Sequence, residues 1–159
     1  MKNYKLVPMD KSHIKEIAQI EKECFSEPWS EASFEEELYN PLCSIIVAQR
    51  PDGAVLGYAG LHAIMDEGYI DNIAVRKDYR GQGIADDLLG AFIRFGQANL
   101  AFLTLEVRPS NEPAIQLYYK HGFVQVGRRK DYYQHPREDA IIMTLEFERE
   151  NENGTETAE

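Results

Sequence analysis

The sequence predicts one mixed α/β domain, in which helices flank a largely antiparallel sheet. Two observations lead to this fold class. The first half of the chain reads as two helices followed by three strands with short turns, and from Ile84 onward the spacing of apolar residues changes to the helical period. The chain has 159 residues, of which 43% are hydrophobic, and this suits a single core. We expect the domain to cover residues 1–147 and the acidic segment 148–159 to be a disordered tail.

The first half begins with an extended segment at residues 4–8. A helix follows, with Asp10 or Ser12 as its cap and apolar residues at helical spacing from Ile14 to Cys24. Residues 25–29 interrupt it, and Ser30 is expected to cap a second helix that ends at Asn40-Pro41. Strands are then expected at 44–48, 55–63 and 69–75, with turns at 50–53 and 66–68.

In the second half, an apolar stripe from Ile84 to Phe95 predicts a helix that packs on the sheet. A strand is expected at 101–107. The next helix has Pro113 in its first turn and ends at Gly122, a residue type that favours helix ends. The last two strands are expected at 123–126 and 140–147, joined through residues 128–139.

Charge and cysteine content narrow the function classes. The net charge of -10 argues against a broad nucleic-acid interface, and it is compatible with a basic peptide or an amine as partner, or with solubility alone. Cys24 and Cys43 fit no metal-binding spacing and make a disulfide framework unexpected. The chain has no long apolar run and no signal-peptide pattern at its start. We therefore expect a cytoplasmic protein without a metal, a membrane span or a direct nucleic-acid partner.

The glycine-rich segment from Arg80 to Ala85 lies between a predicted strand and a predicted helix. Glycines allow close approach of the backbone, and the first N–H groups of a helix attract an anion such as phosphate. A Walker A loop would need Gly-Lys-Ser/Thr, which is absent. The dinucleotide fingerprint would need a third small residue where Asp86 stands. A plain strand-to-helix connection remains the alternative.

Two further residues are candidates for chemistry. Glu106 alternates with apolar residues in a predicted strand, and a carboxylate in mid-strand must be partnered, reach water or line a site. It could simply pair with Arg108 or another base. Tyr118 and Tyr119 lie near the apolar stripe of a predicted helix, where packing in the core is the alternative to catalysis.

The pattern Arg80-x-x-Gly83-x-Ala85, preceded by residues 72–75, resembles the acetyl-CoA signature of the GNAT N-acetyltransferases. The predicted element order is also similar to that fold. The resemblance implies a central mixed, mostly antiparallel sheet whose central strands splay apart, with acetyl-CoA as co-substrate in the gap. The implied acetyl-CoA contacts are Ile73, Ala74, Val75, Arg80, Gly81, Gln82, Gly83, Ile84, Ala85, Asp86 and Asn111.

Other segments are more specific. Residues 25–30, 105–108, 110–111, 117–118, 122–123, 132–133 and 137–143 look like those of the ribosomal-protein-alanine N-acetyltransferase (RimI) family within the superfamily. The resemblance implies that Glu106 is a general base and Tyr118 a general acid. It also implies that the acceptor is the N-terminal alanine of a small-subunit ribosomal protein. The implied acceptor contacts are Pro28, Trp29, Tyr132, Tyr133 and Glu138.

Several alternatives stay open at this point. The acceptor could instead be a lysine side chain or a small-molecule amine. A cofactor-binding module without catalysis is a third class, although an intact Glu106 and Tyr118 speak against it. Trp29 and the two tyrosines of the acceptor set could serve packing alone. The sequence does not distinguish a monomer from a weak dimer.

Overall fold

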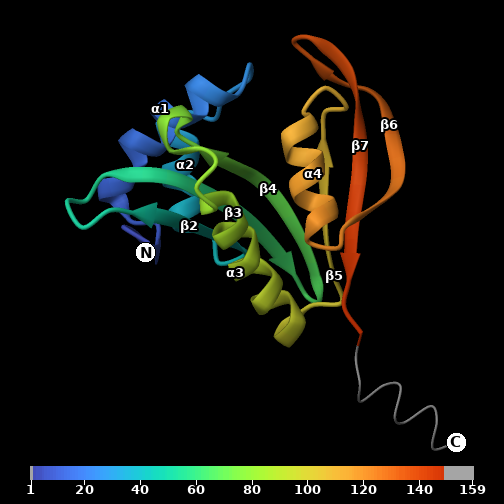
Figure 1. The fold of residues 1–159 in the computed structure, drawn as a ribbon, viewed down its shortest axis with the longest axis horizontal. Helices are drawn as coiled ribbons and strands as arrows, with labels where there is room; N and C mark the ends of the chain where they lie inside the picture. The colour runs from blue at the N-terminus through green and yellow to red at the C-terminus, as the bar shows by residue number, and fades with distance from the viewer. Residues whose placement is uncertain (1, 149–159) are drawn as a thin grey trace, which may run out of the picture.

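A seven-stranded sheet forms the centre of the computed structural model, which describes residues 2–148 (Figure 1). The strand order is β1-β2-β3-β4-β5-β7-β6, and among these described strands only the β4–β5 pair is parallel. The predicted mixed, mostly antiparallel sheet is therefore confirmed. The strands are β1 (Lys5–Pro8), β2 (Cys43–Gln49), β3 (Val55–Ile64), β4 (Glu67–Val75), β5 (Phe102–Val107), β6 (Val124–Gln134) and β7 (Arg137–Glu146). The predicted tail beyond Glu148 lies outside the described residues.

Helices cover both faces of the sheet (Figure 1). They are α1 (Ile14–Cys24), α2 (Glu31–Leu38), α3 (Ile84–Asn99) and α4 (Glu112–Lys120). On one face, α1 and α2 bury Ile17 and Phe34 against Tyr58 of β3. On the other face, Leu88 of α3 packs in a second core with Leu103 of β5. Among the described residues, no helix combines the length and apolar character that crossing a bilayer requires.

Two expected caps, at Ser30 and Asp10, and a third at Asn111 explain where helical segments begin. The Ser30 hydroxyl accepts a hydrogen bond from the Ser33 amide at 3.1 Å, at the start of α2. Asp10 accepts one from the Ser12 amide at 2.8 Å, in the short 3-10 turn Lys11–His13 that leads into α1. The side chain of Asn111 caps α4 by accepting from the Ala114 amide at 3.3 Å.

The central strands splay apart, as the family resemblance implies. The β4–β5 pairing covers only Glu67–Tyr69 of β4 against Phe102–Thr104 of β5. Beyond these residues β4 continues to Val75 and, within the described part of the chain, pairs only with β3, while β5 pairs with β7 along its whole length. A register shift leaves Asp71 without a partner in β3, as in a β-bulge. One edge of the second half of β4 therefore faces an open gap.

The end of the chain differs from the expectation. The prediction of strands at 123–126 and 140–147 with a connection through 128–139 is wrong, because β6 and β7 form one long hairpin that reaches Gln134 and Arg137. β6 is an edge strand that is largely exposed on both faces. Its sequence consequently lacks the alternation of apolar and polar residues that identifies a half-buried strand.

The expected turn at 66–68 is also too long, because β4 already begins at Glu67. Gly68 lies inside the strand, where a Cβ atom would come within 2.6 Å of a Leu100 methyl and 2.7 Å of a Leu103 methyl. This glycine therefore serves close packing between β4 and the segment that enters β5, and not a turn.

Candidate active site

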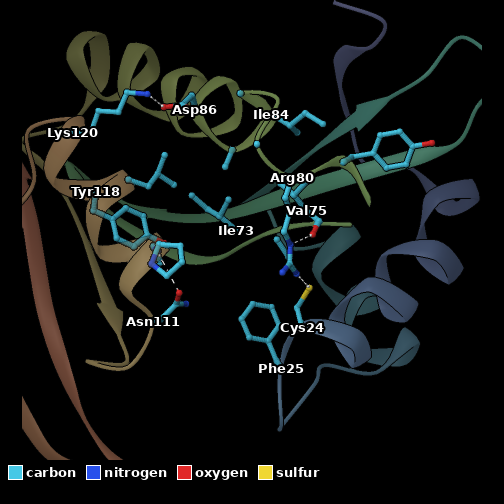
Figure 2. Close-up of a pocket in the computed structure, with 18 of the residues that line it drawn as sticks. Cys24, Phe25, Ile73, Val75, Arg80, Ile84, Asp86, Asn111, Tyr118 and Lys120 are labelled. Carbon is cyan, nitrogen blue, oxygen red and sulfur yellow. Dashed lines mark hydrogen bonds and ion pairs between the residues drawn. The ribbon is translucent and has the colours of Figure 1, made fainter. Parts of the chain in front are cut away.

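A cleft of about 900 Å³ opens between the end of β4, the start of α3, α4 and the end of α1 (Figure 2). Most of the residues that the sequence assigns to acetyl-CoA line it. They are Ile73, Ala74, Val75, Arg80, Gly81, Gly83, Ile84, Ala85, Asp86 and Asn111, together with the predicted acid Tyr118. Gln82 is exposed beside the cleft and is not among its lining residues. Elements that are distant in the sequence thus meet at one cavity.

The glycine loop beside this cleft carries a row of amides that have no hydrogen-bond partner within residues 2–148. Gly81 and Gly83 adopt left-handed backbone angles, with φ of +78° and +84°. The first backbone bond of α3 runs from the Asp87 amide to the Gly83 carbonyl at 3.0 Å. Within residues 2–148, the amides of residues 81–86 have no hydrogen-bonded acceptor. Because the dipole of α3 adds to these donors, the loop suits a phosphate group.

Arg80 connects the loop to the end of β4 and to the end of α1. Its Nε donates to the Val75 carbonyl at 3.0 Å, and its Nη2 lies 3.3 Å from Cys24 Sγ at the end of α1 (Figure 2). The guanidinium therefore occupies one of the backbone acceptors that the splay leaves free. Cys24 lines the cleft as well. The sequence did not indicate this, because Cys24 lies outside every motif.

Ionic contacts of Asp86 join the start of α3 to the end of α4. Asp86 accepts from Lys120 at 2.9 Å and from His121 at 2.8 Å, and these hydrogen bonds lower the pKa of the Asp86 carboxyl. Lys120 lines the cleft, with most of its side chain exposed. The sequence analysis missed this lysine, although it lies two residues after Tyr118 on the same helix.

Tyr118 projects into the cleft from α4, on the side opposite Arg80 (Figure 2). The side chain is only 7% exposed and packs on Phe123 with ring centroids 5.7 Å apart. Burial, and secondarily the neighbouring Tyr133, raise the pKa of the phenol. A buried phenol with a raised pKa holds its proton at neutral pH, and so Tyr118 reaches the cleft as a neutral phenol.

Glu106 lies outside the residues that line the cleft. On β5 it faces away from Leu105 and Val107, which belong to the same core as Tyr118. Its carboxylate accepts hydrogen bonds from Arg129 and from the Tyr132 hydroxyl, both on β6. The expected alternative of a basic partner is thus correct, with Arg129 in that place. The side chain remains 31% exposed and within reach of water.

Arg108 organises the predicted acceptor side. Its guanidinium stacks 4.2 Å from the ring centre of Tyr133 and pairs with Glu138 at 3.2 Å. It also contacts the carbonyl of Pro136 at 2.7 Å and the hydroxyl of Ser26 at 3.5 Å. One side chain therefore ties β5 to the tip of the β6–β7 hairpin and to the loop between α1 and α2.

Of the other expected acceptor contacts, some pack or bond within the protein and some are exposed to solvent. Glu138 is bonded to the segment after β5, because its carboxylate also accepts a hydrogen bond from the Ser110 amide at 2.8 Å. Trp29 packs on Phe34 at 5.4 Å between ring centroids, which agrees with the packing alternative. Pro28 and Tyr132 are exposed.

Glu21 is a buried acid that the sequence analysis did not single out. It lies on α1 and is 2% exposed. Its carboxylate accepts from Asn72 Nδ2 at 3.0 and 3.1 Å and from the Trp29 amide at 3.2 Å. It therefore holds the loop of Trp29 against β4, one residue before Ile73. Burial raises the pKa of Glu21, and the bonds from Trp29 and Asn72 offset this in part.

The Glu21→Gln substitution should remove a pH dependence of stability. Because the pKa of Glu21 is raised above 4.5, its contribution is present below pH 4.5 and is lost as pH rises through the raised pKa. Urea denaturation across this window should show the free energy of unfolding shifting in favour of the variant, relative to wild type, as pH rises. The control is Glu36→Gln, exposed on α2. A flat difference for Glu21→Gln would contradict the assignment.

Comparisons with known proteins agree with this geometry. Residues 14–123 match the acetyltransferase (GNAT) family. A Bacillus subtilis protein, provisionally named ribosomal protein bS18-alanine N-acetyltransferase, is 39% identical over 82% of this chain and 87% of its own. The Escherichia coli K12 protein of that name is 37% identical over 79% of this chain and 86% of its own.

Among solved structures, the crystal structure of the ribosomal-protein-S18-alanine N-acetyltransferase from Escherichia coli matches with a TM-score of 0.85. It is 31% identical in sequence, and the match covers 94% of this chain and 97% of that one. The family match spans more than half of the chain, and the sheet, the splay and the glycine loop are all present. The chain belongs to the GNAT family of acetyltransferases.

Proposed function

We propose that this protein transfers an acetyl group from acetyl-CoA to the N-terminal α-amine of an alanine in a small-subunit ribosomal protein. One observation carries the proposal: a single cleft joins a loop of free amides to the gap between β4 and β5, with Tyr118 on its wall. Relatives with 37% and 39% identity, named as ribosomal protein bS18-alanine N-acetyltransferases, support the choice of acceptor. Such a substrate would place the enzyme in the cytoplasm.

The donor site fits acetyl-CoA by the chemistry of its lining. The amides of residues 81–86 would bind the pyrophosphate, with Lys120 close enough to add positive charge. The main chain of Ile73 and Val75 would bind the pantetheine arm, and Asn111 would make a further contact. Bound there, acetyl-CoA supplies an activated acetyl group as a thioester. No metal is needed for this reaction.

Tyr118 and Glu106 are assigned the two proton transfers. They lie on opposite faces of β5, which would separate them if the sheet were continuous. Because β4 and β5 diverge after Tyr69 and Thr104, a reacting group in the gap can be approached from both faces. Glu106 accepts the proton of the attacking amine through a water, and Tyr118 protonates the departing thiolate.

The Val75 amide is the proposed donor to the tetrahedral oxyanion. The Arg76 amide bonds back to Leu56 of β3 at 2.8 Å. Since the N–H groups of successive strand residues alternate in direction, the Val75 amide is directed to the gap. An amide held by strand geometry needs no rearrangement to meet developing charge.

The α-amine suits this arrangement better than a lysine side chain. An amine attacks only when neutral, and the pKa of an α-amine is about 7.7–8.0 compared with about 10.4 for lysine. One carboxylate acting through water is therefore a sufficient base for an α-amine near neutral pH. A net charge of -10 also favours a basic acceptor segment.

The acceptor is tested with a peptide that starts with alanine followed by basic residues. Its matched control differs in two respects: its N-terminus is blocked, and one internal residue is a lysine. Mass spectrometry should find acetylation of the free α-amine and little of the lysine. Faster modification of the blocked peptide, or of a polyamine, would replace an N-terminal acceptor with a side-chain or small-molecule amine.

Tyr118→Phe and Glu106→Gln should each lower kcat by about a hundredfold or more, because each removes one proton transfer. The affinity for acetyl-CoA, measured by calorimetry, should stay within about twofold of wild type. Tyr119→Phe is the matched control, since this neighbour on α4 is 47% exposed. Wild-type turnover in both active-site variants would refute the assigned roles.

Gly83→Ala should weaken acetyl-CoA binding by roughly tenfold. A Cβ at φ +84° costs about 1–2 kcal/mol, which the loop can relieve only by turning its amides away from the phosphate. Gly53→Ala is the control, because Gly53 has φ of +91° and equally open surroundings in the turn before β3. Both variants should lose stability, but only Gly83→Ala should raise the KM for acetyl-CoA. Equal KM values would argue against the amide cradle.

A further inference from the structure

Four chemically active side chains meet on the α1–α2 side of the sheet, apart from the cleft. They are Glu37 on α2, Cys43 on β2, His62 on β3 and Asp71 at the bulge of β4. Cys43 and His62 are directly opposed across the β2–β3 ladder. None of the four lines the cleft. The sequence analysis expected no metal because the cysteine spacing matches no motif, but the fold brings these residues together from four separate segments.

The donor atoms converge closely enough for one ion. The sulfur of Cys43, a carboxylate oxygen of Glu37 and a ring nitrogen of His62 all lie within 4.8 Å of one another. His62 Nε2 is 2.7 Å from Glu37 Oε2. Tetrahedral zinc, with bonds of about 2.0–2.3 Å, sets its ligand atoms roughly 3.3–3.8 Å apart. Binding an ion would require His62 Nε2 and Glu37 Oε2 to move apart from their present 2.7 Å by roughly 0.6 Å or more.

The second ring nitrogen of His62 supplies an independent observation. His62 Nδ1 is hydrogen-bonded to the carboxylate of Asp71, whose side chain is 23% exposed. In this arrangement Nδ1 is taken up by Asp71, while Nε2 lies on the side of Glu37 and Cys43. Histidines that bind metals in proteins are typically held by a carboxylate in this way.

We propose that Glu37, Cys43 and His62 bind a zinc ion, with Asp71 orienting His62 and a water completing the tetrahedron. A thiolate, an imidazole and a carboxylate form a donor set that suits zinc and disfavours magnesium or calcium. On binding, the Cys43 thiol releases its proton to solvent. The thiolate and the carboxylate then balance the two positive charges of the ion. The site fastens α2 to β2 and β3, and its role is to stabilise this side of the domain.

The competing explanation is a hydrogen-bonded cluster in which a protonated His62 bridges two carboxylates. Both explanations account for the contacts of His62 with Glu37 and Asp71. They differ at Cys43, because in the hydrogen-bonded cluster its thiol donates to Glu37, whereas a metal ion would bind its sulfur directly. Cys43 is one of two cysteines in the chain, and so the other one, Cys24, provides a matched control.

The test uses cobalt(II) as a spectroscopic probe for zinc, added to the full chain freed of metal by chelation. Wild type and Cys24→Ser should both show a sulfur-to-cobalt charge-transfer band, which zinc should abolish by displacement. Cys43→Ser should not show the band. Absence of the band in wild type, or its persistence in Cys43→Ser, would overturn the proposal in favour of the hydrogen-bonded cluster.

A second set of variants keeps both cysteines and guards against misfolding of Cys43→Ser. His62→Gln should weaken zinc binding by at least a hundredfold, and Asp71→Asn by about 10–100-fold. Zinc at a hundredfold excess over its Kd should raise the Tm of wild type by roughly 5 °C or more, and should leave that of His62→Gln unchanged. Equal zinc-dependent shifts in wild type and His62→Gln would refute the site.

Discussion

Only three residue pairs join β4 to β5 before the strands diverge, and the rest of the site depends on this short pairing. Separated strands leave backbone groups without partners, which is costly unless something else bonds to them. β5 keeps β7 as a partner on its other edge along its whole length, as β4 keeps β3. On β4, Arg80 takes one carbonyl, and the remaining groups face the cleft. The opening between β4 and β5 thus leaves backbone groups free, and a substrate bound in the cleft would supply their hydrogen-bond partners.

The two walls of this opening are held by different means. Around the donor side, Asp86 joins the start of α3 to the end of α4. Around the proposed acceptor side, Arg108 gathers the hairpin tip and the loop after α1, while Glu21 binds that same loop to β4. Each anchor is a titratable side chain with several partners in a buried or half-buried setting, where such contacts are stronger than at an open surface.

The sequence predicted those features that local patterns encode. Alternation identified β5 and the unusual position of Glu106, and glycines before a helical stripe identified the loop at Arg80. The long β6 strand was missed because both of its faces are exposed. Glu21 and Lys120 were missed as well, and Arg108 was considered only as a partner of Glu106. The actual partners of all three are distant in sequence, and single charged residues resemble ordinary surface positions. The meeting of Glu37, Cys43 and His62 is likewise visible only after folding.

The amides of residues 81–86 have one more consequence, which concerns how such enzymes diversify. Main-chain donors are present whatever side chains the loop carries, provided that the glycines keep their backbone angles. Mutation can therefore alter neighbouring side chains with little effect on this part of the donor site. Recognition on the acceptor side rests instead on side chains such as Tyr132 and Arg108, each open to replacement. A scaffold divided in this way can change its acceptor over evolutionary time while it keeps one acetyl donor.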